Sequence, residues 1–497
     1  MTRLDCDVTI LGSGFGGTLL AIVARKLGYS VALIERGTHP RFAIGESSTP
    51  LADFKVARLA DQYGLDWFRP LSKYGTWKAN YPDLPCGLKR GFSFFRHERD
   101  THFSHAADNS NALVVAASPT DALADTHWFR ASFDEHLVRR AVSDGVPYLD
   151  NCETHAIRHT PTGWELDAAR PDGAVNIRSA FLIDATGTGQ ALAPVLGLES
   201  VDPAGLLARS RALYSHFTGV KRWRDVLEDA NPGETARHPF PCDDAALHQI
   251  IDGGWMYVLR FENGITSAGF SLDPERHPIR PDESPEQEWQ RLLRTYPSLA
   301  RQFDGAEAVR PFTRTGRLQR RLSRASGPDW ALLPHAAGFL DAWLSPGIAQ
   351  TLFAVNRLAI ALAERGPART RRMVEYGPTV LRELRWVDEI TGTCFATFDR
   401  FPIMGTAAML YFTAAIYCEE RERNGLAGPD DTFLLADHAE YRATAAHLFG
   451  KARTLPATEA GAFLAEAHRL LAPYNSCGMC DPGRGNMYPY TASVRPA

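Results

Sequence analysis

The residues best suited to chemistry near the start of the chain are Gly12, Gly14 and Gly17, which form a GxGxxG pattern. The pattern follows an apolar run and opens a helix-like segment, so the glycines permit a tight turn and let backbone N–H groups approach a pyrophosphate. Glu35 ends the next apolar run, where a carboxylate can accept hydrogen bonds from ribose hydroxyls. The complete unit, with Phe15 at the helix start, predicts a bound dinucleotide in preference to a glycine turn without a ligand.

A second group of candidate residues lies in the stretch GWMYVLRF, residues 254–261. Successive side chains of a strand point to opposite faces, so Trp255, Tyr257 and Leu259 share one face with Phe261. The other face carries Met256, Val258 and Arg260. Such an aromatic face is either the wall that keeps a substrate away from a redox cofactor or the ordinary packing of a half-buried hairpin.

The elements that must position these residues follow an α/β pattern. Residues 8–35 read as a strand, a helix and a second strand, which is the βαβ unit of a nucleotide-binding fold. Another strand that ends in glycines is expected in FLIDATGTG, residues 181–189, and a helix is expected over residues 133–144. A polar loop is expected around residues 106–125.

The second half of the chain changes character twice. From about residue 200 it becomes β-type. The pair Asn263-Gly264 is expected to form the type I′ turn of a hairpin, because both residues tolerate a positive φ. From about residue 348 the chain becomes helix-rich.

Composition describes an ordinary globular chain, large enough for two or three domain-sized units. Of the 497 residues, 44% are hydrophobic and 23% are charged, and the formal net charge is -4. No basic excess favours nucleic acid. The chain enters a strand at once without a leader, and no apolar run reaches the length of a membrane span. We therefore expect a cytoplasmic protein that binds neither nucleic acid nor a membrane.

The eight cysteines follow no regular spacing, which in a cytosolic chain predicts free thiols. Cys477 and Cys480 in NSCGMC have metal or redox spacing, but a lone CxxC lacks the second ligand pair of a structural zinc site. We interpret the two as partly buried thiols in a C-terminal turn, and we expect no metal.

The glycine unit alone does not distinguish FAD from NAD. Two later segments, HWFRASFDEHL with Arg130 and LIDATGTG with Asp184, resemble further cofactor contacts of flavoproteins in the large family that includes aromatic hydroxylases. The sequence contains no second unit of strand, GxGxxG and acid that could serve a nicotinamide. It therefore favours FAD, with reducing power delivered from outside by a separate flavin reductase.

With these motifs the chain resembles the flavin-dependent halogenases, particularly relatives that act on phenols. The family's flavin-proximal loop is similar to HPRFAIGESSTP, and the segment with its catalytic lysine is similar to CGLKRGFSFF. The family's halide loop is similar to AGFLDAWLSPGI, and its Trp-any-Trp-any-Ile-Pro signature is similar to GWMYVLRF. The resemblance assigns to FAD, beyond the residues above, Gly45, Glu46, Ser47, Asp341, Gly347 and Ile348. It assigns to the halide Ser345, Gly347 and Ile348, and to catalysis Lys89, Trp255 and Tyr257.

The resemblance implies halogenation of an electron-rich aromatic compound of phenol, pyrrole or indole type, free or tethered to a carrier. In that family reduced FAD and oxygen convert chloride or bromide to hypohalous acid, which travels to a separate pocket where a lysine, here Lys89, presents electrophilic halogen to the ring. Backbone N–H groups at Ser345, Gly347 and Ile348 would suit the halide. By residue type alone Lys89 would be a surface lysine, and Glu46 could cap a turn or pair with an arginine.

Three departures from the family pattern matter. Trp255 is retained, but the second tryptophan is Tyr257 and the Ile-Pro pair is replaced by Leu-Arg. Ala342 replaces the usual proline of the halide loop. Leu344 stands where tryptophan halogenases carry a glutamate, which points away from free tryptophan as the substrate.

The expected architecture is α/β: a Rossmann-like FAD-binding domain of the glutathione-reductase or hydroxylase type, a β-rich substrate domain and a helical C-terminal region. The expected boundaries are 1–195 for the first part of the FAD domain with an insertion around 75–125, 196–305 for the substrate domain, 306–370 for the returning part and 371–497 for the helical region. Two other functions stay open. One is a flavin-dependent aromatic monooxygenase or oxidase without halogenation, and the other is a flavin-binding sensor without turnover.

Overall fold

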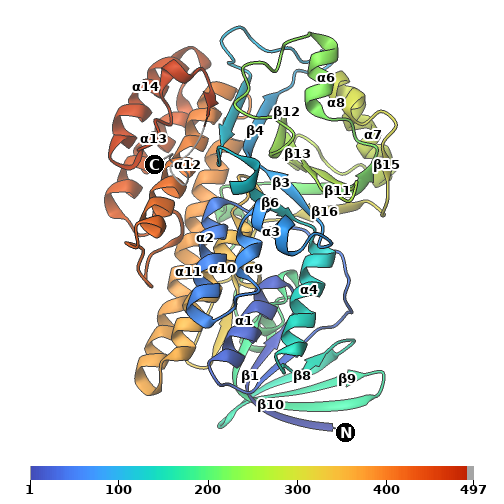
Figure 1. The fold of residues 1–497 in the computed structure, drawn as a ribbon, viewed down its shortest axis with the longest axis vertical. Coiled ribbons are helices and arrows are strands. Elements are labelled where there is room, and N and C mark those ends of the chain that lie inside the picture. Colours follow the sequence, from blue (N-terminus) through green and yellow to red (C-terminus); the bar gives the residue numbers. More distant parts are fainter. Residues whose placement is uncertain (1, 490–497) are drawn as a thin grey trace.

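Two β-sheets carry the fold, and each collects strands from distant parts of the chain (Figure 1). The computed structural model describes residues 2–489. The first sheet contains, in spatial order, β7 (Tyr148–Leu149), β2 (Val31–Ile34), β1 (Thr2–Leu11), β10 (Gly173–Asp184), β9 (Gly163–Arg170) and β8 (Glu153–Thr160), with β18 (Trp330–Leu332) paired to β10. β1 runs parallel to both β2 and β10, and α1 (Phe15–Lys26) connects β1 to β2. The predicted βαβ unit is confirmed.

The second sheet lies at the opposite end of the molecule, in the upper part of Figure 1. In spatial order it contains β15 (Glu307–Ala308), β11 (Arg211–Thr218), β14 (Thr266–Leu272), β13 (Gly254–Arg260), β12 (Ala246–Ile251), β4 (Gly91–Arg96), β5 (Ala112–Ala116) and β20 (Met487–Tyr488), with β16 (Thr313–Arg317) paired to β11. Two small ladders join β3 (Cys86–Lys89) to β6 (Asp125–Trp128) and β17 (Arg320–Arg321) to β19 (Gly338–Phe339).

The expected polar loop around residues 106–125 is wrong in its centre. Residues 112–116 form β5, all of which is buried, and β5 pairs with β4 in the second sheet. The run ALVVA is apolar and β-branched, which is typical of a strand buried on both faces. Its polar neighbours on either side concealed that signal.

The hairpin of β13 and β14 is confirmed, but the turn type is wrong. The Phe261 N–H donates to the Ile265 carbonyl at 2.9 Å, so three residues form the loop and not two. Only Gly264 has a positive φ, of 80°, whereas a type I′ turn needs two such residues. The Asn263 side chain instead accepts from the Ile265 N–H at 3.2 Å, an Asx turn that stabilises the longer loop.

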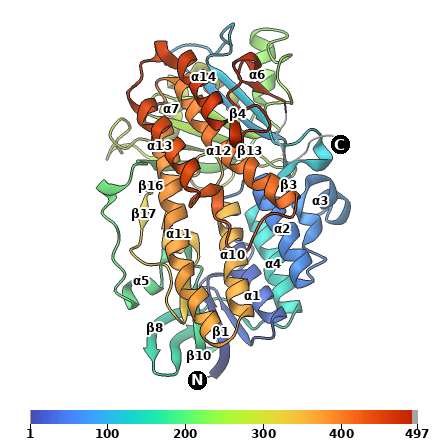
Figure 2. The same ribbon diagram turned by 90° about the vertical axis from the view of Figure 1, so that its left-hand side faces the viewer.

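Helices cover the first sheet and fill the space beside the second. They are α2 (Pro50–Tyr63), α3 (Tyr74–Asn80), α4 (Arg130–Ser143), α5 (Leu192–Val195), α6 (Trp223–Ala230), α7 (Pro285–Thr295), α8 (Pro297–Gln302), α9 (Pro334–Ala337), α10 (Gly347–Ala363), α11 (Gly366–Phe395), α12 (Phe401–Arg423), α13 (Ala439–Thr454) and α14 (Ala460–Leu471). α11 runs along the molecule from the level of the first sheet toward the C-terminal helices (Figure 2). The predicted helix-rich end is confirmed, and α4 starts three residues before its expected first residue.

The expectation that no apolar run reaches the length of a membrane span is wrong for α12. This helix of 23 residues has a window with a mean hydropathy of 1.4, which is long and apolar enough to cross a membrane. However, 89% of that window is buried inside the protein, against α2, α11 and α14. Such burial is what the core helix of a large domain shows, because a helix that is apolar all round must be covered.

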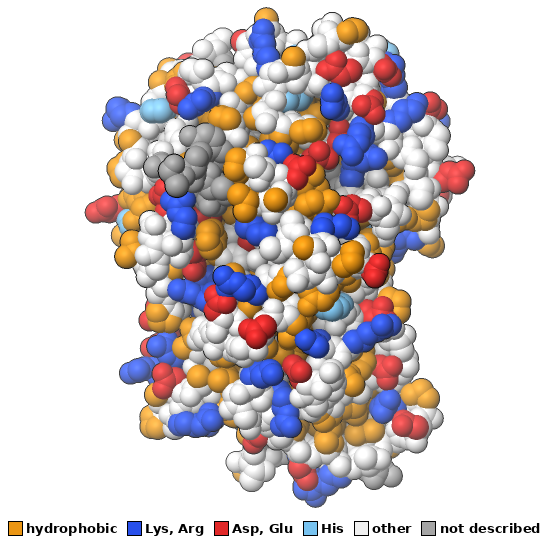
Figure 3. Space-filling view, viewed as in Figure 1, with side chains coloured by type: hydrophobic (Ala, Val, Ile, Leu, Met, Phe, Trp, Pro, Cys, Tyr) orange, Lys and Arg blue, Asp and Glu red, His pale blue; other side chains and the backbone are white. Residues whose placement is uncertain are grey.

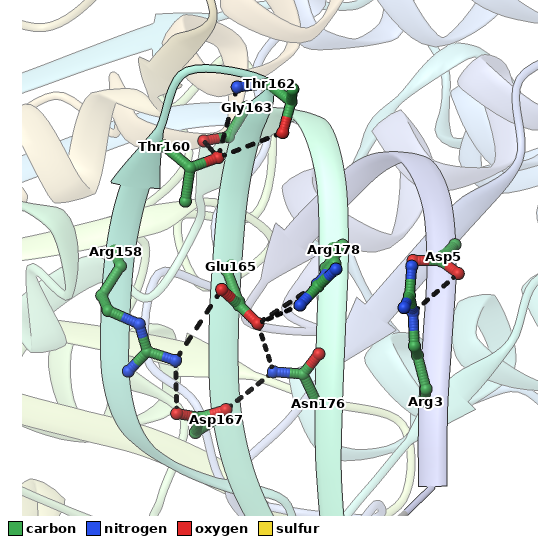
Figure 4. A network of polar contacts seen from close by, with 10 residues as sticks. All are labelled: Arg3, Asp5, Arg158, Thr160, Thr162, Gly163, Glu165, Asp167, Asn176 and Arg178. Atoms are coloured by element: carbon green, nitrogen blue, oxygen red, sulfur yellow. Dashed lines mark hydrogen bonds and ion pairs between the residues drawn. The ribbon is translucent and has the colours of Figure 1, made fainter.

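The outer face of β8, β9 and β10 carries polar side chains (Figure 4). Arg158 pairs with Asp167 at 2.5 Å, and Asn176 and Arg178 both donate to Glu165. The charged groups lie near solvent, so these pairs contribute little to stability. Over the face drawn in Figure 3, basic and acidic side chains are interspersed and form no single-sign patch.

Candidate active site

The glycine loop between β1 and α1 shapes a phosphate-binding helix end. A Cβ on Gly17 would lie 2.2 Å from the Gly12 carbonyl oxygen, and a Cβ on Gly12 would lie 2.6 Å from the Ala185 carbonyl oxygen. Both positions therefore need glycine for close backbone packing. Gly14 differs, because a Cβ there would meet nothing nearer than Arg130 Nη2 at 3.7 Å. The first N–H groups of α1 have no acceptor within the helix, so this open side suits a diphosphate.

Glu35 lies at the carboxyl end of β2, beside the glycine loop. Its Oε2 accepts hydrogen bonds from the Ser13 N–H, the Ser13 hydroxyl and Arg41, at 3.1, 2.9 and 3.0 Å, and its Oε1 accepts from the Gly37 N–H at 3.0 Å. Burial alone would raise the pKa of Glu35, but these donors lower it to about 2. The group is therefore an ionised carboxylate at neutral pH, as a ribose-binding residue must be.

Arg130, the first residue of α4, holds the flavin-proximal loop. Its Nε and Nη2 donate to the two carboxylate oxygens of Asp134 at 2.7 and 2.8 Å, and its Nη1 donates to the Ile44 and Gly45 carbonyls at 3.0 Å. The guanidinium also lies 4.7 Å from the centre of the Phe15 ring. Gly45 has a φ of +89°, a conformation that favours glycine. Phe15, Gly45 and Arg130 thus form one group at the N-terminus of α1.

These residues fit FAD. An added Cβ on Gly14 would lie about as far from Arg41 as from Arg130, at 4.0 and 3.7 Å, so two guanidinium groups border the open helix end. Two cations, free helix N–H groups and an ionised Glu35 are the donor and acceptor set that a diphosphate and a ribose require. Arg41 was missed by the sequence reading, because an arginine in a loop gives no periodic signal.

Asp184 was predicted to contact the cofactor, and its described hydrogen bonds all lie within the loop after β10. Its Oδ1 accepts from the Thr186 N–H and hydroxyl at 2.9 and 2.6 Å, and its Oδ2 accepts from the Leu192 N–H at 2.9 Å. Burial raises the pKa of Asp184. The carboxylate therefore fixes the loop whose Ala185 carbonyl packs against Gly12.

Asp341 plays a similar part at the other end of the site. Its Oδ2 accepts from the Ser210 and Ser271 hydroxyls at 2.5 and 2.8 Å, and its Oδ1 accepts from the Trp343 N–H at 2.9 Å. Ser271 belongs to β14 and Ser210 directly precedes β11. The buried carboxylate therefore ties the loop before α10 to the second sheet.

Glu46 and Ser47 continue the flavin-proximal loop between the two sheets. Glu46 Oε1 lies 3.1 Å from His216 Nε2 in β11, so the partner is a histidine and not the arginine considered from the sequence. Ser47 forms an isolated bridge with His127. Within residues 2–489, Glu46 Oε2 and the Ser47 hydroxyl are buried without a hydrogen-bond partner. Two such atoms on one loop are what a polar ligand would satisfy.

The predicted alternation of side chains along β13 is confirmed. Trp255 and Tyr257 pack in the large core shared with the first sheet, whereas Met256 and Val258 pack in a separate core on the other side of the second sheet. One strand therefore divides two interiors, and its aromatic face points toward the core shared with the first sheet.

Trp255 belongs to a continuous aromatic layer. The His248 ring stacks on Phe94 and on Trp255 with ring centres 4.4 and 5.0 Å apart, and Trp343 packs edge-on against His248 and Trp255 at 5.3 and 5.1 Å. Burial lowers the pKa of His248 to about 3, so the ring is neutral at physiological pH. His248 and Trp343 were not singled out from the sequence, since only the fold brings them to Trp255.

The halide-type loop before α10 has an unusual backbone. Leu344 and Ser345 have φ values of 62° and 57°, a left-handed conformation that costs a non-glycine residue about 1–3 kcal/mol. The Ser345 N–H donates to the Ala342 carbonyl at 3.0 Å, so the expectation that this N–H is available to a halide is wrong. The N–H groups of Gly347 and Ile348 open α10 and have no acceptor within the helix.

Lys89 is fully buried at the end of β3, which overturns the reading of a surface lysine. Its Nζ donates to the Ser48 carbonyl and lies 4.0 Å from the centre of the Phe92 ring. Burial lowers the pKa of Lys89 to about 8, although Asp125 and Asp53 oppose this shift. The side chain is therefore an amine that exchanges its proton near neutral pH.

A small depression with a volume of about 20 Å³, partly open to solvent, lies next to Lys89. Its lining includes the Phe92 ring that contacts Lys89, together with Thr49, which follows Ser48. The remaining lining comes from β5 and from α12, including Tyr411 and Phe412. Both aromatics are also members of the buried core. The Thr49 hydroxyl is buried without a partner in the described part of the chain.

The C-terminal cysteines form no metal centre in the region that the structure covers. No disulfide joins any of the eight cysteines, and no cluster of three or more metal-ligating side chains occurs, within residues 2–489. Cys480 is buried and Cys477 is half-buried. Burial raises the pKa of the Cys480 thiol, which makes it unreactive.

Sequence comparison identifies relatives over most of the chain. Residues 10–84 match the family model described as an NAD(P)-binding Rossmann-like domain. The chain is 31% identical over 436 residues to tetracycline 7-halogenase of Kitasatospora aureofaciens, an alignment that covers 86% of this chain and 76% of the relative. It is 28% identical over 451 residues to monodechloroaminopyrrolnitrin halogenase PrnC of Pseudomonas fluorescens, covering 88% and 74%. It is 24% identical over 361 residues to a 1H-pyrrole-2-carbonyl peptidyl-carrier-protein brominase of Pseudoalteromonas luteoviolacea, covering 72% and 77%.

Comparison of the folds also finds halogenases. The halogenase PltM in complex with phloroglucinol and FAD superimposes with a TM-score of 0.83 at 24% identity, covering 97% of this chain and 99% of PltM. The brominase Bmp2 superimposes with a TM-score of 0.60 at 19% identity, covering 79% and 87%. The helical C-terminal region is therefore part of the fold shared with PltM.

Proposed function

This chain belongs to the flavin-dependent halogenases, and from that membership we propose that it halogenates an electron-rich aromatic compound through Lys89. It is an FAD-dependent enzyme with a Rossmann-like cofactor domain. The named relatives act on a tetracycline, on monodechloroaminopyrrolnitrin and on a carrier-bound pyrrole. The proposed substrate is therefore of phenol, pyrrole or indole type, free or tethered to a carrier protein.

The residues around the glycine loop would hold the cofactor. Arg41 and Arg130 would flank the diphosphate at the N-terminus of α1, and Glu35 would accept from the ribose. Glu46 and Ser47 would meet the ring system with their unpartnered oxygens. Bound FAD, once reduced, supplies with oxygen the two-electron oxidant that turns a halide into hypohalous acid.

The halide would lie at the start of α10. The N–H groups of Gly347 and Ile348 lack helical acceptors, and the positive end of the helix dipole favours an anion there. The N–H of Ser345 closes the turn that presents them, so its part is to shape the loop. Asp341 would keep this loop fixed against the second sheet.

The aromatic layer would separate oxidant production from the substrate. His248, Trp255 and Trp343 are packed ring against ring, and each is buried. A substrate in the depression beside Phe92 would be on the far side of this layer from the halide loop. Direct transfer of oxygen to the ring is then prevented, and only a small diffusible oxidant reaches Lys89.

The single observation that carries the proposal is the position of Lys89. Its Nζ lies between the Ser48 carbonyl and the Phe92 ring, one side chain away from the depression. Desolvation strengthens its hydrogen bonds and makes its protonation adjustable. The aromatic lining suits a planar ring, and the Thr49 hydroxyl could bond a polar substituent on it.

An assay with reduced FAD, oxygen and bromide tests the function. Phenols, pyrroles and indoles would be offered free and as carrier thioesters, and products would be identified by mass spectrometry. We expect a product with the paired isotope signal of bromine, formed only when bromide is present. A product that gains oxygen without any dependence on halide would establish the alternative of an aromatic monooxygenase. Oxygen consumption no faster than that of free reduced FAD would favour a binding protein without turnover.

A further inference from the structure

Asp125 lies directly across a strand pair from Lys89. In the ladder of β3 and β6 the Cα atoms of Lys89 and Asp125 are partners. Directly opposed residues of such a ladder project from the same face, so the two side chains are neighbours. Both are fully buried. A carboxylate opposite a buried lysine is a costly arrangement that needs a reason.

The ammonium of Lys89 is not bound to a carboxylate. Its described contacts are the Ser48 carbonyl and the Phe92 ring, and no ion pair within 4.0 Å joins it to an acid of the described chain. When it is deprotonated, an amine held in this way has a lone pair that can attack a halogen atom. Direct pairing with Asp125 would instead have fixed the proton on nitrogen.

Asp125 lies beside two other charged residues, the half-buried Lys73 and the buried Asp53. Lys73 Nζ lies 2.7 Å from Asp53 Oδ2 and 3.6 Å from Asp125 Oδ1. Both carboxylate oxygens of Asp125 are buried and accept no hydrogen bond from the described residues. Burial raises the pKa of Asp53 well above its usual range, and Asp125 raises it further. Burial works against the charge of Lys73, but the two acids raise its pKa.

The charges of this cluster balance in two ways. Lys73 carries one positive charge throughout. When Lys89 is protonated, two ionised carboxylates make the total zero. When Lys89 is neutral, one proton on the Asp53–Asp125 pair again makes the total zero. A proton can thus pass from Lys89 to the pair without leaving a net charge in the interior, where a net charge would be expensive.

The other titratable groups near Lys89 do not compete for this proton. His127 on β6 and His248 on β12 face the lysine, and burial lowers their pKa values to about 3. From α12, Tyr411 faces Asp125 and Glu419 faces Lys73. Burial raises the pKa of Tyr411, which keeps the phenol neutral. The acids on α2 and β6 are the carboxyl groups whose charges act on Lys89, so we expect these two to exchange protons with it.

We infer that the Asp53–Asp125 pair, supported by Lys73, holds the proton that Lys89 releases before its amine accepts halogen. These are positioning residues, since none of them touches the reacting halogen. The inference rests on the proposed role of Lys89 in halogen transfer.

The chemistry balances around this proton. An ammonium has no lone pair, so Lys89 first transfers H⁺ to the carboxylate pair. The neutral amine then attacks the halogen of hypohalous acid: an N–halogen bond forms, the oxygen–halogen bond breaks, and hydroxide leaves with the amine hydrogen as water. Transfer of the halogen to the aromatic carbon breaks the N–halogen bond, and the ring proton returns to nitrogen. Lys89 is then regenerated as an amine.

Titration of Lys89 itself tests the inference without relying on turnover. The chain has seven lysines, so selective ¹³Cε labelling gives few resonances, and Lys89→Met identifies the one of interest. We expect a midpoint near pH 8 in the wild-type protein. Asp125→Asn removes the nearest anion and should lower the midpoint by about one pH unit, because an opposite charge at short range shifts a pKa by roughly 1–3 units. Asp53→Asn should shift it in the same direction by less.

Lys55 supplies an internal control for folding. It is also buried, with its Nζ 4.0 Å from the Phe353 ring, but it pairs with Glu422. Its resonance should not move in either variant. Unchanged Lys89 midpoints in both variants, with an unmoved Lys55 resonance, would overturn the inference. If Asp125→Asn does not fold, the shift in Asp53→Asn decides the matter.

At low pH the halogenation rate should rise with increasing pH, and the midpoint of this rise should match the titration midpoint of Lys89. In Asp125→Asn more of the Lys89 amine is neutral at low pH. The rise of the halogenation rate with pH should therefore move to lower pH by the same amount as the titration midpoint of the Lys89 resonance. A titration midpoint that moves while the rise of the rate stays fixed would contradict the inference and leave halogenation itself intact. Loss of halogenation in the wild-type protein would instead refute the proposed function, whatever the titration shows.

Discussion

At the scale of single residues, the side chains on the two faces of β13 are expected to have different roles. Trp255 on one face closes the aromatic layer, and Met256 on the other face fills a different core. Both side chains are almost completely buried, so truncation of either one leaves a cavity. Under the proposed function, only the loss of Trp255 would open a route between the halide loop and the depression beside Phe92.

We therefore predict that Trp255→Ala changes the products and Met256→Ala does not. Truncations of this kind cost about 2–5 kcal/mol of stability, so both variants should be destabilised to a similar degree. With FAD bound, Trp255→Ala should release more hydrogen peroxide or give hydroxylated product at the expense of halogenated product. Product analysis by mass spectrometry checks this, and an unchanged product spectrum in Trp255→Ala would remove the separating role of the layer.

The sequence singled out candidate residues that lie in compact motifs but not those that the fold brings together. Gly14, Glu35 and Lys89 stand within motifs whose spacing carries meaning over a short stretch. Asp53, Lys73 and Asp125 are common surface residue types, each in a different segment. Nothing local distinguishes them, because their meaning lies in burial and in distances across three elements.

At the scale of elements, the halide loop depends on its attachment to the second sheet. Asp341 accepts hydrogen bonds from strand and loop donors on both sides. Two left-handed residues, Leu344 and Ser345, follow it and need such support to persist. Neither residue type favours that conformation, so the sequence could predict the loop but not its backbone conformation. For the same reason it could not predict that the Ser345 N–H is used within the loop.

We predict that Asp341→Ala weakens halide use selectively. Three donors lose their acceptor, and the free energy of unfolding should fall by about 3 kcal/mol. The KM for bromide should rise by about tenfold or more, which corresponds to a loss of at least 1.4 kcal/mol in binding. Steady-state kinetics at varied bromide provides the measurement.

Asp388→Ala is the matched control for this variant. Asp388 is also buried and accepts from two backbone N–H groups, those of Leu207 and Ala208, both at 2.9 Å. Its loss should destabilise the protein comparably but leave the KM for bromide unchanged. An equal rise of that KM in both variants would mean that general loosening, and not the halide loop, is responsible.

At the scale of the whole molecule, the chain supplies one nucleotide-binding unit within the part that the structure describes. The first sheet carries the glycine loop, and the second sheet and C-terminal helices enclose the depression. The parallel pairing of β12 with β4 joins segments more than a hundred residues apart. No local pattern predicts such pairing, so the sequence could not show that strands of the expected insertion around residues 75–125 join the second sheet.

A single nucleotide unit predicts that reducing equivalents arrive as reduced FAD. An unrelated flavin reductase, or FAD reduced by light, should support the same rate of halogenation as any other source at the same concentration of reduced FAD. Comparison of initial rates with the reductase enclosed behind a dialysis membrane checks this. A requirement for one particular reductase in direct contact would show that diffusion of FAD is not the route.

The central claim is that Lys89 delivers halogen, and Lys89→Met compared with Lys55→Met tests it most directly. Both lysines are buried against a phenylalanine ring at 4.0 Å, so the two changes are alike in kind. With reduced FAD, oxygen and bromide, and rates referred to folded protein, Lys89→Met should lose brominated product by about 100-fold or more, as expected for loss of a positioned catalytic group, while oxygen consumption continues. Lys55→Met should retain the product. Bromination at the wild-type rate in Lys89→Met, or loss of oxygen consumption together with product, would contradict the account.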